Sequence, residues 1–309
     1  MVIIRHSVPE LLIFRKLLTD NINTFAGLKS KNPKIKLMVA VGGATFGTAI
    51  FSELAKSATS RSNFAKNSVA FLQRYKLDGL DLDWEYPVIN SNGLDKANFV
   101  LLLTDLKNQL TANNLLFSIA VAAGQWASDQ AYDIPKVQAQ VDFINLMAYD
   151  LHGSWDGVTG HNAPMFNDAV SVDNCVKYWI AKGAPRNKLI LGIATYGQLF
   201  TLANPNNNGF GAATVGATQL SYSEICKNNW QRVWSQSQQV PYKYQGNQWV
   251  GYDDVESVIV KAKYSNSENL GGVMIWSMEN DDVTGSCGQG ASPLIKTVYD
   301  ITMFEKVSI

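Results

Sequence analysis

The amino-acid sequence predicts an α/β fold in which a mainly parallel sheet is combined with helices. Six short apolar runs have the length of buried strands, and amphipathic segments with helical spacing lie next to most of them. A repeated succession of strand and helix is typical of a parallel sheet. The 309 residues suffice for one large domain, or for one domain that carries an insertion. The predicted strands cover residues 36–41, 79–84, 116–123, 143–149, 188–196 and 271–278.

Two segments between these strands have clear helical patterns. In residues 95–110 the apolar side chains recur every three or four positions and form one face of a helix. Residues 172–185 predict a second helix that ends at Gly183, with Pro185 just beyond it, which is a common helix exit.

The succession of strands and helices is interrupted before the last predicted strand. The Asn-, Gly- and Pro-rich stretch 204–211 predicts a loop, and residues 240–252 predict a hairpin that turns at Gly246-Asn247. The helix that follows begins with a capping box formed by Asp253 and Glu256. This region is therefore expected to be a small α+β insertion.

The second predicted strand carries a row of acids within the sequence LDGLDLDWEYP. Side chains alternate between the two faces of a strand, so Asp81, Asp83 and Glu85 share one face. The opposite face carries Leu80, Leu82 and Trp84. A solvated edge strand is one explanation, but apolar strands on both sides in sequence argue against an edge position. Three acids in an interior must share protons or bind a ligand.

Composition excludes several classes of partner. Lys+Arg and Asp+Glu are balanced at 26 each, so nothing indicates a nucleic-acid partner. No apolar run reaches the length of a membrane span, and the charged first residues make a poor signal peptide. Cys175, Cys226 and Cys287 lack metal-ligand spacing, which leaves at most one disulfide and one free thiol.

The motif DGLDLDWE resembles the Asp-x-x-Asp-x-Asp-x-Glu signature of glycoside hydrolase family 18, the chitinases and chitinase-like lectins. INLMAYDLHGSWDGVTGHNAP, KLILGIATYG and GGVMIWSMENDD follow in the family's order. The resemblance implies a (β/α)8 TIM-type barrel, N-terminally incomplete, with a small α+β insertion domain before the last strand. The catalytic barrel would comprise residues 1–199 and 271–309, with 1–28 atypical. The insertion would comprise residues 200–270.

The resemblance also implies a mechanism in which the substrate's own N-acetyl carbonyl is the nucleophile. Glu85 would be the general acid and then the general base. Asp83 would hold the acetamide, and Asp81 would share a proton with Asp83. No metal or organic cofactor is implied.

Substrate-binding residues are implied in the same way. Tyr149 and Asp150 would bond the acetamide and the reducing-side sugar, and Trp276 would lie under the central sugar. Trp155 would stack beyond the cleavage point. Met147, Tyr196 and Met274 would line the pocket. His152 and His161 are expected to be loop or supporting residues. Cys226 would pair with Cys287, leaving Cys175 free.

The sequence departs from the family at its start. Residues before Lys29 should hold two strands, but MVIIRH supplies at best one weak strand, and VPELLIFRKLL predicts a helix with Pro9 in its first turn. Missing strands would expose sheet edges. The chain thus resembles a truncated or misassembled gene product without a signal peptide.

Smaller departures remove expected sugar contacts outside the central site. Ala44 and Thr45 stand where many relatives have a Trp-Asn pair, Gln198 replaces a frequent Arg, and Gly216 replaces a frequent acid. Two functions follow. The first is a monomeric, extracellular chitinase that cleaves β-1,4-N-acetylglucosamine linkages in chitin or chitooligosaccharides. The alternative is a non-catalytic chitin-binding lectin or an inactive truncated product.

Overall fold

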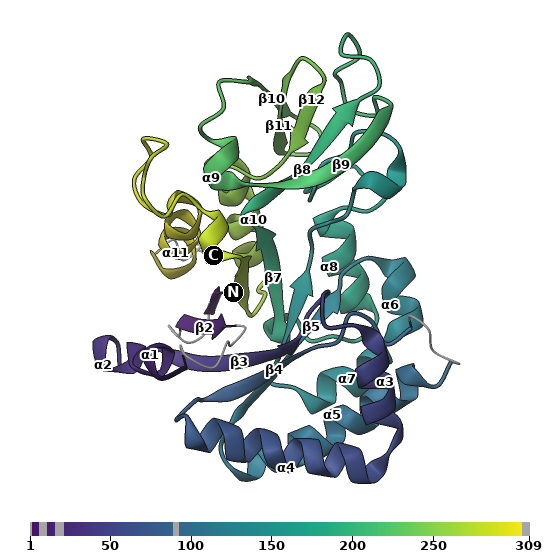
Figure 1. Cartoon of the computed structure of the whole chain (residues 1–309), viewed down its shortest axis with the longest axis vertical. Coiled ribbons are helices and arrows are strands. Elements are labelled where there is room, and N and C mark those ends of the chain that lie inside the picture. The colour runs from purple at the N-terminus through teal and green to yellow at the C-terminus, as the bar shows by residue number, and fades with distance from the viewer. Residues whose placement is uncertain (1, 6–10, 16–21, 89–92, 305–309) are drawn as a thin grey trace. The chain divides into compact units, whose positions relative to one another are not determined.

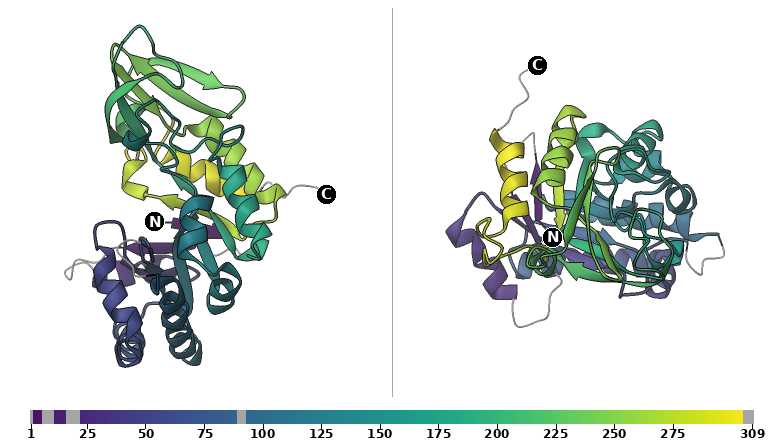
Figure 2. Two further views of the ribbon diagram at one scale, coloured as in Figure 1. Left: turned by 90° about the vertical axis from the view of Figure 1, so that its right-hand side faces the viewer. Right: turned by 90° about the horizontal axis from the view of Figure 1, so that it is seen from above.

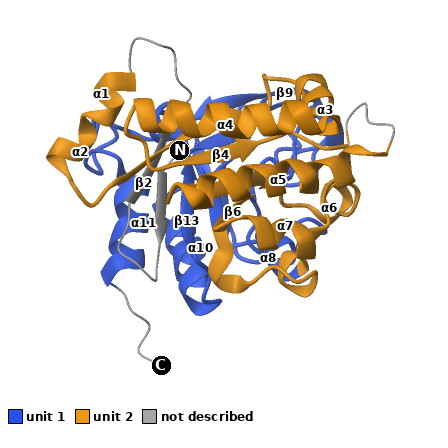
Figure 3. Ribbon diagram, turned by 90° about the horizontal axis from the view of Figure 1, so that it is seen from below, with its two compact units in different colours: residues 1–6, 147–177, 191–309 blue, residues 7–146, 178–190 orange. Residues whose placement is uncertain are grey.

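The computed structural model describes residues 2–5, 11–15, 22–88 and 93–304. The chain forms two compact units (Figure 3): unit 1 comprises residues 1–6, 147–177 and 191–309, and unit 2 comprises residues 7–146 and 178–190. No helix in the described part of the chain is long and apolar enough to cross a membrane.

Unit 2 is built on a sheet with the strand order β2-β3-β4-β5-β6, continued by the first residues of β7. The pairs β2–β3, β3–β4 and β4–β5 are parallel, and Asp81 lies opposite Ala40 on one side and Ser118 on the other. The strands span Leu11–Arg15 (β2), Lys36–Gly42 (β3), Gly79–Asp83 (β4), Leu116–Ala122 (β5), Phe143–Met147 (β6) and Leu189–Ala194 (β7).

Helices of unit 2 pack beside these strands, as Figure 1 shows for α3, α4 and α5. The apolar face predicted for α5 is buried in full, because Phe99, Leu102, Leu103, Leu106 and Leu110 are at most 1% exposed. The helices span Ile22–Ala26 (α1), Leu28–Lys31 (α2), Thr48–Lys56 (α3), Ala58–Arg74 (α4), Asp95–Ala112 (α5), Gln125–Ala131 (α6) and Ile134–Gln140 (α7).

Unit 1 contains two groups of strands. One has the order β1-β13-β7, with β1 (Val2–Arg5) antiparallel to β13 (Gly272–Trp276). The other is a five-stranded antiparallel sheet with the order β10-β11-β12-β8-β9, seen from two further sides in Figure 2 (green). Its strands span Tyr196–Leu202 (β8), Thr214–Ser221 (β9), Gln231–Ser235 (β10), Val240–Gln245 (β11) and Gln248–Gly251 (β12).

The helices of unit 1 lie between its strands along the chain, and α11 follows the last strand. α8 begins in unit 1 and ends in unit 2. The α-helices span Val172–Ala181 (α8), Tyr222–Ile225 (α9), Val255–Ser267 (α10) and Pro293–Phe304 (α11), and the short 3₁₀ turns span Ser154–Asp156 (η2), Arg186–Lys188 (η3) and Met278–Asn280 (η4).

Every one of the six predicted strands is present, as β3 to β7 and β13. The predicted hairpin is also confirmed: β11 and β12 pair with Gln245 opposite Gln248, and Gly246 has a φ of 55° that favours glycine. The antiparallel sheet begins at Tyr196, inside the segment that was predicted as a single strand, because β7 ends at Ala194 and β8 begins two residues later.

The predicted capping box is displaced by one residue. Asp254, not Asp253, is the N-cap of α10, and its carboxylate accepts hydrogen bonds from the backbone N–H groups of Glu256 and Ser257. Asp253 is buried and binds Nζ of Lys261 at 2.6 Å. An acid with a buried Lys partner is unavailable for capping, so tertiary contact overrides the local pattern.

The helix predicted over VPELLIFRKLL is wrong where the structure describes it. Leu11–Arg15 forms β2, which pairs in parallel with β3 from Leu12 opposite Lys36 to Arg15 opposite Val39. Pairing of this run satisfies backbone groups that β3 would otherwise leave open at its edge, and Ile13 and Phe14 are residue types that favour strands. The remainder of that predicted helix, and Pro9, lie outside the described residues.

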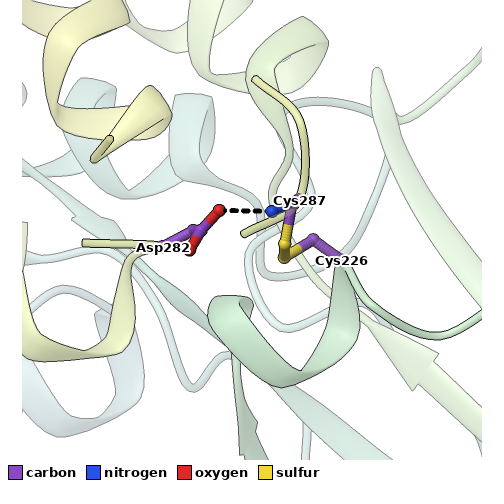
Figure 4. A group of neighbouring side chains, drawn as sticks. All are labelled: Cys226, Asp282 and Cys287. Atoms are coloured by element: carbon purple, nitrogen blue, oxygen red, sulfur yellow. Dashed lines mark hydrogen bonds between the residues drawn. A yellow bond between two sulfur atoms is a disulfide. The ribbon is translucent and has the colours of Figure 1, made fainter. Parts of the chain in front are cut away.

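The predicted cysteine pairing is confirmed. Cys226, after α9, and Cys287, after η4, form a disulfide with a Cα–Cα distance of 5.8 Å. Cys175 on α8 is buried and free, and burial raises the pKa of its thiol to about 12. Figure 4 shows Asp282 beside the bond, where its carboxylate accepts a hydrogen bond from the Cys287 N–H at 2.7 Å.

Candidate active site

The acid-bearing strand β4 is an interior strand. It is hydrogen-bonded to β3 on one side and to β5 on the other, which excludes a solvated edge as the reason for its acids. Leu80, Leu82 and Trp84 are at most 1% exposed and pack into the core. The alternation of side chains then directs Asp81 and Asp83 to the opposite face of the sheet.

Asp81 is buried within a set of hydrogen-bond donors. Its Oδ1 accepts from Oγ of Ser118 at 2.5 Å and from Nδ2 of Asn145 at 2.9 Å. Burial raises the pKa of Asp81 to about 6, although both hydrogen bonds act in the opposite direction. A carboxyl group with this pKa can hold a proton near neutral pH.

Asp83 lies two residues further along the same face. Burial, followed by the nearby charges of Glu85 and Asp81, raises the pKa of Asp83 well above its usual range. Within the described part of the chain, Oδ2 of Asp81 and Oδ1 of Asp83 have no hydrogen-bond partner. Each aspartate therefore keeps one acceptor oxygen available for a shared proton or a ligand.

The glycine pair after β3 allows the backbone at Asp83 to approach closely. The Gly43 N–H donates to the Asp83 carbonyl at 2.8 Å, and a Cβ on Gly42 would lie only 2.0 Å from that oxygen. Both glycines have positive φ, at 118° and 93°. Gly42-Gly43 thus fixes the end of β4 without a side chain.

Glu85 follows β4 and is held between two anchored neighbours. Thr48 donates from Oγ1 to the Tyr86 carbonyl at 3.0 Å and accepts from Nε1 of Trp84 at 2.6 Å. The Glu85–Tyr86 peptide is cis. Burial and then the charge of Glu85 raise the pKa of Tyr86, so its hydroxyl stays protonated and can donate to an adjacent carboxylate.

A second group of predicted residues is assembled in unit 1. Asp150 accepts a hydrogen bond from the Tyr196 hydroxyl at 2.6 Å and another from Nε2 of Gln198 at 2.6 Å. The Tyr149 hydroxyl faces Sδ of Met274 at 3.9 Å, and the rings of Tyr149 and Tyr196 meet edge to face. The predicted residues Tyr149, Asp150, Tyr196 and Met274 are therefore linked by a continuous series of contacts.

Three other predicted residues lie near the ends of their elements. Met147 is the last residue of β6 and is partly buried. Trp276 is the last residue of β13 and is 41% exposed, and Trp155 in η2 is 66% exposed. An indole that stays exposed next to a buried strand is available for stacking on a ligand.

Ser118, Asn145 and Gln198 support the acids and were not predicted to do so. Ser118 and Asn145 are polar residues inside the otherwise apolar strands β5 and β6, and both are fully buried. That isolated polarity is a sequence pattern that could have identified them. Gln198 was interpreted only as the loss of a sugar contact, whereas it binds Asp150.

Comparison with solved structures defines the class of fold. The crystal structure of the Ostrinia furnacalis Group IV chitinase in complex with allosamidin has a TM-score of 0.88 and 38% identity, over 91% of this chain and 83% of that chain. The fold is a (β/α)8 TIM-type barrel with an antiparallel insertion before its last strand. It departs from the regular pattern at its N-terminal end, where β1 is antiparallel to β13. The expected fold class is confirmed.

The chain belongs to the glycosyl hydrolases of family 18, whose sequence profile matches residues 7–281. Chitotriosidase-1 of Mus musculus is 42% identical over 299 residues, or 88% of this chain. The chain spans 64% of that relative's length. The family resemblance seen in the motifs is thereby confirmed.

Similar proteins differ in whether they are active. Human YKL-39, described as a pseudo-chitinase with retained chitooligosaccharide binding properties, has a TM-score of 0.87 and 36% identity, over 96% of this chain and 88% of that chain. Family membership supports a glycosidase in general, while activity of this particular chain depends on its own residues.

Proposed function

We propose that the chain hydrolyses β-1,4-N-acetylglucosamine linkages in chitin or chitooligosaccharides by a substrate-assisted retaining mechanism. The observation that carries the proposal is the pair Asp81 and Asp83 on one interior strand, with Glu85 two residues beyond its end. Burial raises the pKa of both aspartates. Carboxyl groups that can hold a proton near neutral pH are suited to a mechanism that moves protons.

Each step follows from the chemistry of these groups. Glu85 donates its proton to the glycosidic oxygen while the acetamide carbonyl oxygen of the adjoining sugar attacks C1, so the C1–O bond breaks and an oxazolinium forms. The Asp83 carboxylate accepts a hydrogen bond from the acetamide N–H and offsets the positive charge of the oxazolinium. Asp81 takes up the proton that Asp83 releases. Glu85 then removes a proton from water, which attacks C1 and regenerates the acetamide with retention of configuration.

The residues of unit 1 are proposed to bind the sugars. The Tyr149 hydroxyl and the Asp150 carboxylate supply polar contacts, while Trp276 and Trp155 supply exposed aromatic faces. Met147, Tyr196 and Met274 would line the same binding site. We also propose that the protein is extracellular and monomeric; the Cys226–Cys287 disulfide supports an oxidising compartment.

Glu85→Gln tests the proposal because it removes the transferable proton with almost no change of shape. Hydrolysis of a fluorogenic chitotrioside should fall by about 10²- to 10⁴-fold, whereas binding of chitohexaose by calorimetry should remain. Glu53→Gln, the same chemical change at an exposed glutamate on α3, is the matched control for general damage. A variant that keeps more than half of the activity would remove Glu85 from this role.

A non-catalytic chitooligosaccharide-binding function is the second candidate. The similarity to a pseudo-chitinase and the absence of aromatic side chains at Ala44 and Thr45 favour it. Binding of chitohexaose without any fluorophore release by the wild-type chain would select this candidate.

A further inference from the structure

The loop after β6 presents an exposed tryptophan on a single 3₁₀ turn. Trp155 is the middle residue of η2 (Ser154–Asp156) and is 66% exposed. Its ring lies against the backbone of Gly153, since a Cβ added there would come within 2.4 Å of the ring. The indole is therefore supported from one side by main chain rather than by a packed core.

Asp156 closes this turn. Its Oδ2 accepts a hydrogen bond from the Gly153 N–H at 2.9 Å, and the Asp156 N–H donates to the Gly153 carbonyl at 3.1 Å. Two reciprocal bonds fix the backbone on both sides of Trp155.

His152 joins the turn to a buried acid. Its Nδ1 is in hydrogen-bond contact with Oδ2 of Asp156 at 3.2 Å. Its Nε2 lies 3.2 Å from Oδ1 of Asp168, a close approach without hydrogen-bond geometry. The Asp168 side chain is only 8% exposed, and its Oδ2 accepts a hydrogen bond from Nε2 of Gln238 at 2.8 Å. The imidazole thus connects an exposed turn to an acid that is itself held in place.

The ring has little room to move. The backbone of Gly160 packs against the His152 side chain, because a Cβ added at Gly160 would lie 2.6 Å from both Cβ and Cγ of His152. The imidazole is only 18% exposed. The His152 side chain is confined by the backbone and contacts the carboxylates of Asp168 and Asp156. It is therefore well suited to hold the turn rigidly.

We propose that His152 is a positioning residue for sugar binding, which acts through Asp156 to hold Trp155 in place for stacking on an N-acetylglucosamine unit. This inference rests on the proposed function. A turn fixed before the ligand arrives saves the cost of ordering it on binding. Loss of His152 should consequently affect binding, and KM more than kcat.

The test measures chitohexaose binding by calorimetry in the Glu85→Gln background, so that no hydrolysis occurs. His152→Ala should weaken binding about fivefold to tenfold, a change typical of one lost contact. In a further Trp155→Ala background the same substitution should have almost no effect, because residues that act through one another are not additive. In a Trp126→Ala background, which removes a different exposed indole, the full effect should persist. Additive effects of His152→Ala and Trp155→Ala would overturn the proposal.

A second readout does not depend on sugar. With 5-fluorotryptophan incorporated, the ¹⁹F resonance of Trp155, assigned by Trp155→Phe, should shift or broaden in His152→Ala. His152→Gln, which keeps one donor, should restore much of the wild-type spectrum. An unchanged resonance would overturn the positioning role. If the wild-type chain binds no chitohexaose, the proposed function fails, and the resonance then decides the role of His152 by itself.

Discussion

The carboxyl groups of β4 differ from ordinary aspartates because of where the backbone places them. Asp81 is 1% exposed and accepts two hydrogen bonds, yet burial still raises its pKa to about 6. Ionisation of a group at such a position is less favourable than in water, so it lowers the free energy of unfolding. A buried carboxyl group with a raised pKa, two residues from Asp83 on the same face, is suited to proton exchange with Asp83.

This cost predicts how Asp81→Asn changes stability with pH. The pKa of Asp81 is 3.8 when unfolded and about 6 when folded, so the folded state binds the proton more tightly and loses stability as the pH rises between these values. Asn cannot ionise and can still accept from Ser118 and Asn145. Urea unfolding at pH 7 should show the variant more stable by about 2–3 kcal/mol, with the difference vanishing below pH 4.

Asp300→Asn removes an exposed charge and is the control for this measurement. A stability difference for Asp81→Asn that is the same at pH 4 and pH 7 would contradict the assigned origin of the effect. Activity should fall in the same variant, because the proton shared with Asp83 is lost.

At the scale of elements, the adjacent acids Asp253 and Asp254 at the start of α10 have different structural roles. Asp254 caps the helix, whereas Asp253 binds Lys261, which also donates to the Ala163 carbonyl at 2.8 Å. The Ser257 hydroxyl completes the set by donating to Asp253 at 2.7 Å. Both partners of the ion pair are 1% exposed, so water cannot replace either of them.

The two acids should therefore respond differently to alanine. Asp254→Ala removes the cap and the contact with Nε of Arg232 at 2.8 Å, and it should lower the free energy of unfolding by about 1–2 kcal/mol. Asp253→Ala leaves the buried Lys261 charge without its partner, and it should lower the free energy of unfolding by about 3–5 kcal/mol. Denaturant unfolding of the two variants side by side measures both effects. Equal losses would mean that Lys261 finds another partner.

For the molecule as a whole, the disulfide is a covalent restraint within unit 1. Cys226 and Cys287 are 61 residues apart in sequence, and their bond connects the segment between α9 and β10, in the middle of the antiparallel insertion, to the loop after η4. Closing a loop of that length removes conformations mainly from the unfolded chain.

Cys226→Ser together with Cys287→Ser should lower the free energy of unfolding by about 4 kcal/mol in the loop-entropy model. Cys175→Ser, which leaves the bond intact, is the control for the loss of a thiol. Thermal unfolding with and without dithiothreitol gives the comparison, and the double variant should be insensitive to the reductant. A wild-type protein that is equally insensitive would show that the bond contributes nothing to stability.

The sequence by itself determined six strands of the barrel, the acid face of β4 and the hairpin at Gly246, because each depends on local periodicity or turn chemistry. Only the tertiary structure decided that Leu11–Arg15 is a strand. Its hydrogen-bond partner is β3, which is distant in sequence, and local propensity describes only neighbouring residues. The same holds for the support of the site. Isolated polarity within apolar strands distinguishes Ser118 and Asn145 in the sequence. Which acid each of them binds, and that Gln198 binds Asp150, follows only from contacts between elements distant in sequence.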